Sequence, residues 1–246
     1  QWFGDMVTEK KSRDHWLHEG FATYYAWLAE KEVFGEDYYY WKLFQSAERL
    51  KELSDSGKGE SLLDPKASSL TFYEKGAWAL HILKEQIGKE NFDTAINNYL
   101  QNNAYSIVVT ENFIEEVEKV SKISIDEWVQ DWLKQSAFQG TEALASLQRS
   151  SFIKNYMEVA ALRETPFSIK KELLSKALSK PINEYVGQEA IFQLSGENSP
   201  EAIELYKKAF ASNNLMLRQA VAVSVDKIPL ELKSEFFSLL NDESYL

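Results

Sequence analysis

Apolar residues recur every three or four positions along most of the first 133 residues, which indicates amphipathic α-helices. We therefore expect an all-α fold in this part of the chain. The segments with helical spacing are 16–31, 38–53, 72–87, 92–100, 113–120 and 125–133.

Residues at the ends of these segments fit helix boundaries. Asp14 and Thr110 stand where N-cap residues are expected, and Gly88 stands where a glycine closes a helix. Residues 54–69, "SDSGKGESLLDPKASS", are rich in Gly and Ser, which predicts one long loop.

The second part of the chain carries a weak internal repeat. Residues 173–191 and 205–223 each combine an apolar helix end, a polar turn and a second helix, which begins near Gln188 or Arg218. The matching positions are offset by about 30 to 32 residues, as in stacked helical hairpins. Ser199 followed by Pro200 predicts a helix start. A third unit opens at residue 231 and stops, so we expect a truncated HEAT-like helical-repeat domain. An irregular helical bundle remains the alternative.

Tryptophan and proline divide the chain between two domains. All seven tryptophans lie before residue 133, whereas four of the five prolines follow residue 165. This shift predicts domains at 1–139 and 140–246, with the junction near residues 139–141.

The composition limits which metal ligands and which partners the chain can have. The chain has no cysteine and three histidines, so imidazole and carboxylate are its strong metal ligands. The formal charge of −11 argues against a nucleic-acid partner. No run approaches the roughly 18 to 20 apolar residues of a membrane-spanning helix. The chain begins at Gln1 rather than at Met, so we expect a missing upstream part, and localisation in the cytoplasm or outside the cell stays open.

Glu19 is the first candidate for chemistry. It lies four residues after His15, on the same helix face, where a carboxylate and an imidazole can bind zinc together. Two ligands are too few for a catalytic site, and a carboxylate near a helix N-terminus is favourable without any further role. From the residues alone, both interpretations stay open.

Two stretches around Glu19 resemble a known family. "QWFGDMVT" at 1–8 and "WLHEGFATYY" at 16–25 are similar to the residues that follow the zinc-binding helix in the aminopeptidase N family of zinc metallopeptidases, which includes leukotriene A4 hydrolase. That family reads H-E-x-x-H-Q-W-x-G-x-x-V-T and then W-L-N-E-G-F-A. The resemblance implies that Glu19 is the third zinc ligand. It also implies that both histidine ligands and the general-base glutamate lie just upstream of Gln1.

A further stretch, "LTFYEKGAWALHIL" at 70–83, is similar to the Y-x-K-G-A segment of the family. The resemblance implies that Tyr73 donates a hydrogen bond to the substrate carbonyl as negative charge develops there. A phenol with a pKa near 10 is protonated at neutral pH and suits this role. The alternative is that Tyr73 only packs beside Phe72 and Trp78 in a helical core.

The resemblance extends to about residue 139 and contains departures. Residues 110–138 look like the last helices of the catalytic domain, with Gln135 retained but Ala137 and Gln139 in place of Gly and Pro. His18 stands where Asn is common. His18 and Asp14 could orient a metal ligand through hydrogen bonds, although a structural role explains each of them as well. His81, on an apolar helix face, is expected to be buried and bonded to a backbone carbonyl.

The resemblance implies a zinc-dependent aminopeptidase that acts on peptides with a free N-terminus. Residues 1–139 would be the C-terminal helical half of a thermolysin-like catalytic domain. We expect these 246 residues alone to be inactive. One alternative is a non-catalytic relative that serves as a helical protein-interaction scaffold. Another is a helical-repeat binding module throughout, which requires repeats across residues 1–139. The preferred N-terminal residue, a second activity and the oligomeric state stay open.

Overall fold

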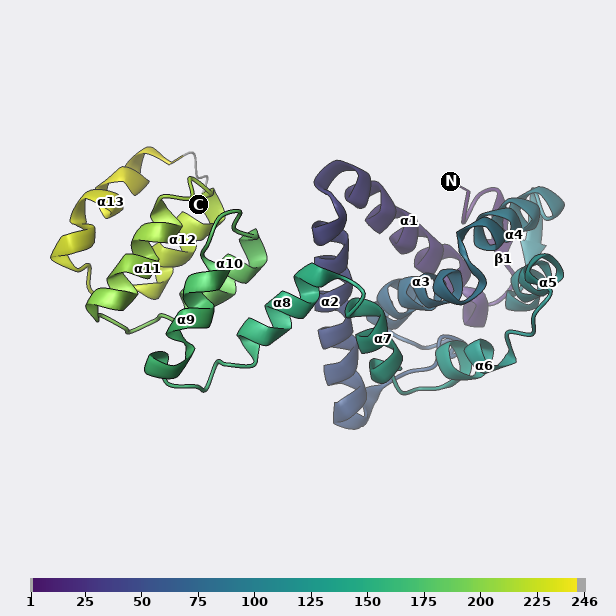
Figure 1. The fold of residues 1–246 in the computed structure, drawn as a ribbon. Helices are drawn as coiled ribbons and strands as arrows, with labels where there is room; N and C mark the ends of the chain where they lie inside the picture. Colours follow the sequence, from purple (N-terminus) through teal and green to yellow (C-terminus); the bar gives the residue numbers. More distant parts are fainter. Residues whose placement is uncertain (1, 243–246) are drawn as a thin grey trace. The chain divides into compact units, whose positions relative to one another are not determined.

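Helices make up nearly all the regular structure in residues 2–242, the part of the chain that this computed structural model describes (Figure 1). The all-α class is therefore confirmed. The described residues divide into two compact units, one up to Ser150 and one from Ser151 onward. Among these residues, none of the helices combines the length and apolar composition that crossing a bilayer requires.

The first unit contains a helix at each of the six predicted segments. It also has a seventh helix after residue 139. The helices are α1 (Trp16–Phe34), α2 (Glu36–Leu53), α3 (Gly76–Ile87), α4 (Lys89–Asn102), α5 (Thr110–Ser121), α6 (Asp126–Trp128) and α7 (Gly140–Leu147).

Irregular helical turns adjoin three of these helices. A π-helical turn, Thr71–Lys75, leads directly into α3, and another, Val129–Lys134, continues α6. A third, Ser54–Lys58, follows α2 and occupies the start of the predicted loop at 54–69. The loop prediction is thus wrong for its first residues.

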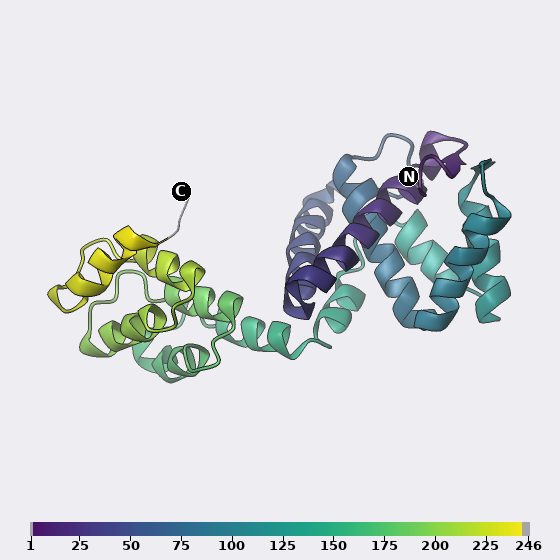
Figure 2. The same ribbon diagram turned by 90° about the horizontal axis from the view of Figure 1, so that it is seen from above.

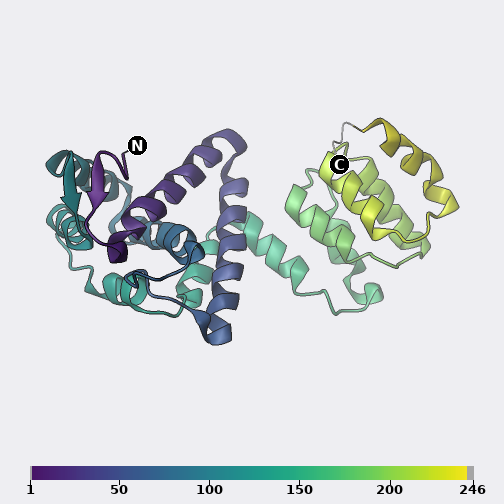
Figure 3. The same cartoon turned by 180° about the vertical axis from the view of Figure 1, so that it is seen from behind.

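Two strands that the sequence pattern did not predict pair in parallel. They are β1 (Val7–Glu9) and β2 (Ser106–Val108), with Val7 opposite Ser106 and Glu9 opposite Val108 (Figure 3). Strands of three residues are too short to show a period. A 3₁₀ turn, Ser12–Asp14, connects β1 to α1.

Tryptophan side chains form much of the core of the first unit. Trp16, Trp78, Trp128 and Trp132 are each no more than 1% exposed. The indoles of Trp78 and Trp132 stack with ring centroids 6.3 Å apart, and Trp128 Nε1 donates to the carbonyl oxygen of Ala79 at 2.8 Å. Buried aromatic rings carry large apolar areas, so this core accounts for four of the seven tryptophans before residue 133.

Helices α1 and α3 cross at two glycines. A Cβ atom on Gly20 would lie 3.0 Å from Gly76 Cα, and a Cβ on Gly76 would lie 2.8 Å from Gly20 Cα. These separations are shorter than ordinary contacts between carbon atoms, which are about 3.5–4.0 Å. The two helices can therefore approach this closely only because both positions lack a side chain.

The second unit consists of consecutive short helices that pack against one another (green to yellow in Figure 2). Ser199 caps α11 and Pro200 is its first residue, as predicted. Asn183 and Asn214 cap α10 and α12, so these helices begin earlier than the predicted starts near Gln188 and Arg218. The predicted repeat and the junction near residues 139–141 stay predictions. The helices are α8 (Ser151–Ala160), α9 (Phe167–Ala177), α10 (Glu184–Phe192), α11 (Pro200–Phe210), α12 (Leu215–Ser224) and α13 (Lys233–Ser238).

Candidate functional site

Glu19 and Tyr73 meet where α1 and α3 cross. Glu19 lies in the first turn of α1, and Tyr73 lies in the π-helical turn before α3, so the Gly20–Gly76 contact brings their segments together. The Tyr73 hydroxyl donates a hydrogen bond to the Glu19 carboxylate. This bond is the main cause of a raised pKa for Tyr73, with desolvation as a smaller cause. The phenol is therefore protonated at neutral pH.

Both side chains are accessible from solvent. The Glu19 side chain is 25% exposed and Tyr73 is 41% exposed. Tyr73 is thus not a buried core residue between Phe72 and Trp78, which are 6% and 0% exposed. At a partly open surface, a carboxylate can bind a cation and a neighbouring protonated phenol can donate a hydrogen bond.

Lys75 fixes the turn that carries Tyr73. Its side chain is buried, and Nζ donates to the carbonyl oxygens of Glu60 and Gln135 at 2.7 Å each and of Ser136 at 3.3 Å. Burial lowers the pKa of Lys75 to about 8, partly offset by the Glu60 carboxylate. Sequence reasoning gave Lys75 no role, although it lies within the Y-x-K-G-A stretch.

Glu9, at the end of β1, contacts both histidines near Glu19. His15 Nδ1 lies 2.9 Å from Glu9 Oε1, and His18 Nδ1 contacts Glu9 Oε2. The backbone N–H of Glu9 donates to His18 Nε2 at 2.9 Å. His15 Nε2 lies 3.5 Å from Glu19 Oε1.

Glu9, His15 and His18 thus each offer a metal-ligand atom, and these atoms all lie within 4.8 Å of one another. Glu9 was missed as a site residue because only the pairing of β1 with β2 and the turn after it bring Glu9 back to α1. His15 was noted for its spacing from Glu19 but was not predicted as a site residue.

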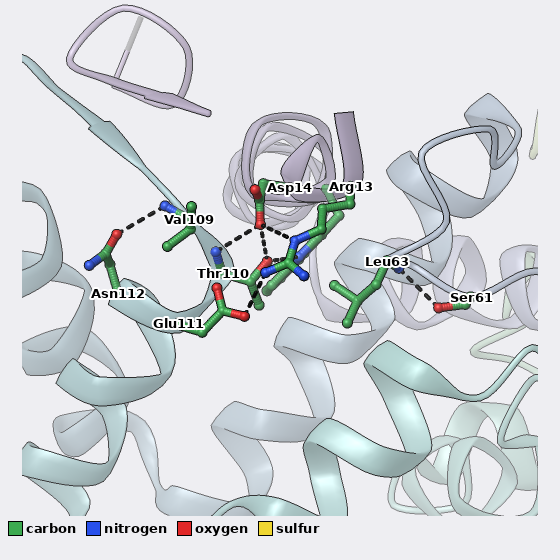
Figure 4. Close-up of polar contacts among 9 residues, drawn as sticks. Arg13, Asp14, Ser61, Leu63, Val109, Thr110, Glu111 and Asn112 are labelled. Atoms are coloured by element: carbon green, nitrogen blue, oxygen red, sulfur yellow. Dashed lines mark hydrogen bonds and ion pairs between the residues drawn. The ribbon is translucent and has the colours of Figure 1, made fainter. Parts of the chain in front are cut away.

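Asp14 points toward the start of α5, where it contacts Thr110 (Figure 4). It is fully buried, and Oδ1 accepts hydrogen bonds from the backbone N–H of Thr110 at 2.9 Å and from its hydroxyl at 2.8 Å. Asp14 therefore satisfies the first N–H group of α5 rather than one of its own helix. Next to it, Arg13 Nη2 donates to Glu111 Oε1 at 2.7 Å.

The predictions that Asp14 and Thr110 are N-caps were therefore wrong. His15 precedes α1 and Val109 precedes α5, neither with a side-chain cap to its own helix, and Thr110 is the first residue of α5. Asn112 Oδ1 accepts from the backbone N–H of Val109 at 2.9 Å (Figure 4). The reason is that Asp14 accepts from the start of α5, 96 residues later, and local sequence cannot show a cap that comes from another element.

His81 is buried as expected, but its partners differ from the expectation. Tyr39 Oη lies 2.8 Å from its Nδ1, and Ser146 Oγ lies 2.9 Å from its Nε2. Two hydroxyl groups thus replace the predicted backbone carbonyl. Burial is the main cause that lowers the pKa of His81, to about 3.

Comparison with known proteins gives a consistent result for the first unit. The model of the peptidase family M1 domain matches residues 1–132. Aminopeptidase M1-D of Oryza sativa subsp. japonica is 32% identical over an alignment of 148 residues, and the match covers 56% of this chain and 17% of the relative. Aminopeptidase M1 of Arabidopsis thaliana is 32% identical over an alignment of 150 residues, and the match again covers 56% of this chain and 17% of the relative.

The match to a third relative extends slightly further. Leucyl aminopeptidase of Saccharolobus solfataricus is 27% identical over an alignment of 161 residues, and the match covers 61% of this chain and 20% of the relative. The chain thus spans about a fifth of the length of these curated relatives. The matched region covers the segments that carry Glu19 and Tyr73, and it identifies residues 1–132 as peptidase-domain sequence rather than helical repeats.

Proposed function

Because the chain belongs to peptidase family M1, we propose that its first unit forms part of the active site of an aminopeptidase, which removes N-terminal residues from peptides. The hydrogen bond from Tyr73 to Glu19 carries this proposal, because it joins the two segments that resemble catalytic motifs. The aminopeptidase names of the relatives support it.

The proposed cofactor is Zn²⁺, with Glu19 as one of its ligands. The side chain fits this role in its chemistry, because a partly exposed carboxylate is a common zinc ligand. Catalytic zinc sites have three protein ligands, and the 246 residues contain no H-E-x-x-H sequence. When bound, zinc lowers the pKa of a water molecule and polarises the carbonyl that is attacked.

Tyr73 would serve as the hydrogen-bond donor to the substrate. In the chain as described, its proton is directed at Glu19. With the Glu19 carboxylate holding the metal, the Tyr73 hydroxyl would be free to donate to the substrate carbonyl oxygen. Loss of one such donor costs about 10²–10³ in kcat in other enzymes.

We propose that His18 and Asp14 support Glu19 and are not ligands of this zinc ion. His18 is tied to Glu9 through both ring nitrogens, which fixes the first turn of α1 against β1. Asp14 holds the start of α1 to α5 through Thr110. Both residues would keep Glu19 in place without contacting the substrate.

The 246 residues alone should not hydrolyse peptides, because they contain no H-E-x-x-H sequence to supply the two histidine ligands and the general base of the catalytic zinc site. The first test is an assay of this chain, with added Zn²⁺, on aminoacyl p-nitroanilides and short peptides. The second is the same assay on the product of the whole encoding gene. Metal-dependent release of N-terminal residues by the 246-residue chain would refute its proposed inactivity.

In the product of the whole gene, Tyr73→Phe should lower kcat by about 10²–10³-fold without changing the zinc content. Glu19→Gln should lower the zinc content, measured by mass spectrometry of the metal. The matched control is Tyr105→Phe, because Tyr105 is 89% exposed and belongs to another segment. An unchanged kcat in Tyr73→Phe would refute the role of that residue. A gene product that has no H-E-x-x-H and no activity would favour the scaffold alternative.

A further inference from the structure

Glu9, His15 and His18 form a second group of metal-ligand side chains, and all three belong to this chain. We propose that they bind a divalent first-row transition-metal ion through two imidazole nitrogens and one carboxylate. Nothing in this inference depends on the proposed peptidase activity. Two histidines and a carboxylate form a donor set that suits such ions and suits Mg²⁺ or Ca²⁺ poorly.

The separations between the donor atoms fit a metal ion. With bonds of about 2.0–2.1 Å in tetrahedral geometry, neighbouring ligand atoms lie roughly 3.3 Å apart. His15 Nδ1 and Glu9 Oε1 are 2.9 Å apart, and the atoms of all three side chains lie within 4.8 Å. Small side-chain movements are therefore enough to surround an ion.

The hydrogen bond at the far side of His18 determines which nitrogen is available. Nε2 of His18 accepts from the backbone N–H of Glu9, so Nε2 carries no proton and Nδ1 faces the Glu9 carboxylate. A metal ion would take the place of the proton on Nδ1, which leaves to solvent. The backbone of β1 thus fixes both the tautomer and the direction of this ligand.

His15 is held in the same way by its surroundings. Phe72 packs edge-on against the imidazole, with ring centroids 5.1 Å apart, and Nε2 lies 3.5 Å from Glu19 Oε1. A carboxylate behind the second nitrogen of a histidine is the usual arrangement around metal-binding imidazoles. In this site Glu19 would orient His15 and would not itself be a ligand.

Glu9 supplies the negative charge. Its Oε2 is buried and contacts His18 Nδ1. A bound cation would take the place of the Nδ1 proton and neutralise this buried oxygen. Pairing of Glu9 with Val108 in the β1–β2 ladder holds the backbone at this position.

Calorimetric titration of the 246-residue chain with Zn²⁺, after removal of metal by a chelator, tests the site. We expect one ion per chain. Glu9→Gln and His18→Gln should lower the affinity by at least about 100-fold, more than the loss of a partner outside direct coordination. Glu19→Gln should lower it by less than about 10-fold, because an amide oxygen still accepts from His15. Glu32→Gln, an exposed position farther along α1, is the matched control and should change nothing.

A spectroscopic measurement identifies the ligands directly. Cu²⁺ bound to the chain should show electron paramagnetic resonance couplings to two imidazole nitrogens, and to only one in His18→Gln. Circular dichroism checks each fold, and if His18→Gln unfolds, His15→Gln replaces it because that side chain is more exposed. Absence of Zn²⁺ binding, unchanged affinity in Glu9→Gln, or a loss in Glu19→Gln as large as in Glu9→Gln would overturn the proposal.

Discussion

The contact between Gly20 and Gly76 gives a stability prediction with a definite sign. Replacing a helical glycine with alanine ordinarily stabilises a protein by about 0.5–1 kcal/mol. At Gly20 the new Cβ would lie 3.0 Å from the backbone of Gly76, and at Gly76 it would lie 2.8 Å from the backbone of Gly20. Backbone cannot rotate aside as a side chain can, and overpacking costs about 1–3 kcal/mol. We therefore expect each substitution to lower the free energy of unfolding by about 1–2 kcal/mol.

Urea unfolding followed by circular dichroism at 222 nm measures this effect. Gly140→Ala is the matched control, because its Cβ would meet only Lys51 Cδ at 3.9 Å, an ordinary contact. That variant should be as stable as the parent or more stable. The double variant, Gly20→Ala with Gly76→Ala, should cost less than the sum of the single ones, since one separation of α1 and α3 relieves both clashes. If Gly20→Ala and Gly76→Ala stabilise the chain as Gly140→Ala does, the close crossing of α1 and α3 is wrong.

Three further predictions concern buried polar groups. Burial holds the pKa of His81 near 3, against an ordinary 6.5, so between these pH values the unfolded chain binds a proton that the folded chain does not. The free energy of unfolding should therefore fall by about 2 kcal/mol between pH 6.5 and pH 4.5. Urea titrations at both pH values measure this loss, and it should be smaller in His81→Gln. Lys75→Met leaves three carbonyl oxygens without their donor and should cost about 2 kcal/mol or more in urea unfolding, whereas the exposed Lys66→Met should cost almost nothing. Asp14→Ala removes the acceptor of both hydrogen bonds that Thr110 donates and should lower the free energy of unfolding by about 1–3 kcal/mol. An unchanged midpoint of urea unfolding would contradict this interpretation.

Periodicity predicted the long helices α1 to α5 well because each of them buries an apolar face over about three turns or more. The π-helical turn that carries Tyr73 could not be distinguished in this way, since it continues into α3 with the same apolar spacing. The starts of α10 and α12 were misplaced because the sequence offers several polar residues before each apolar run. The structure shows that Asn183 and Asn214 are the ones that accept the free N–H groups.

The sequence predicted only part of the candidate site. Glu19 and Tyr73 stood out through motifs, and their contact follows from two glycines within the same motifs. Glu9 has no such signal, because its position beside His15 and His18 depends on a parallel pairing with residues almost a hundred positions later. Contacts of this kind are set by tertiary packing, which a single sequence does not encode locally.

The hydrogen bonds between Asp14 and Thr110 also determine when this region can form during synthesis. Their partners are 96 residues apart in the chain. At a translation rate of about 5–20 residues per second, residue 110 follows residue 14 by roughly 5 to 20 seconds. Until then, β1 cannot pair with β2, and the indole of Trp16 lacks its contacts with Phe113 and Trp128. The nascent chain thus presents this apolar segment to chaperones for seconds before the surroundings of Glu19 can close.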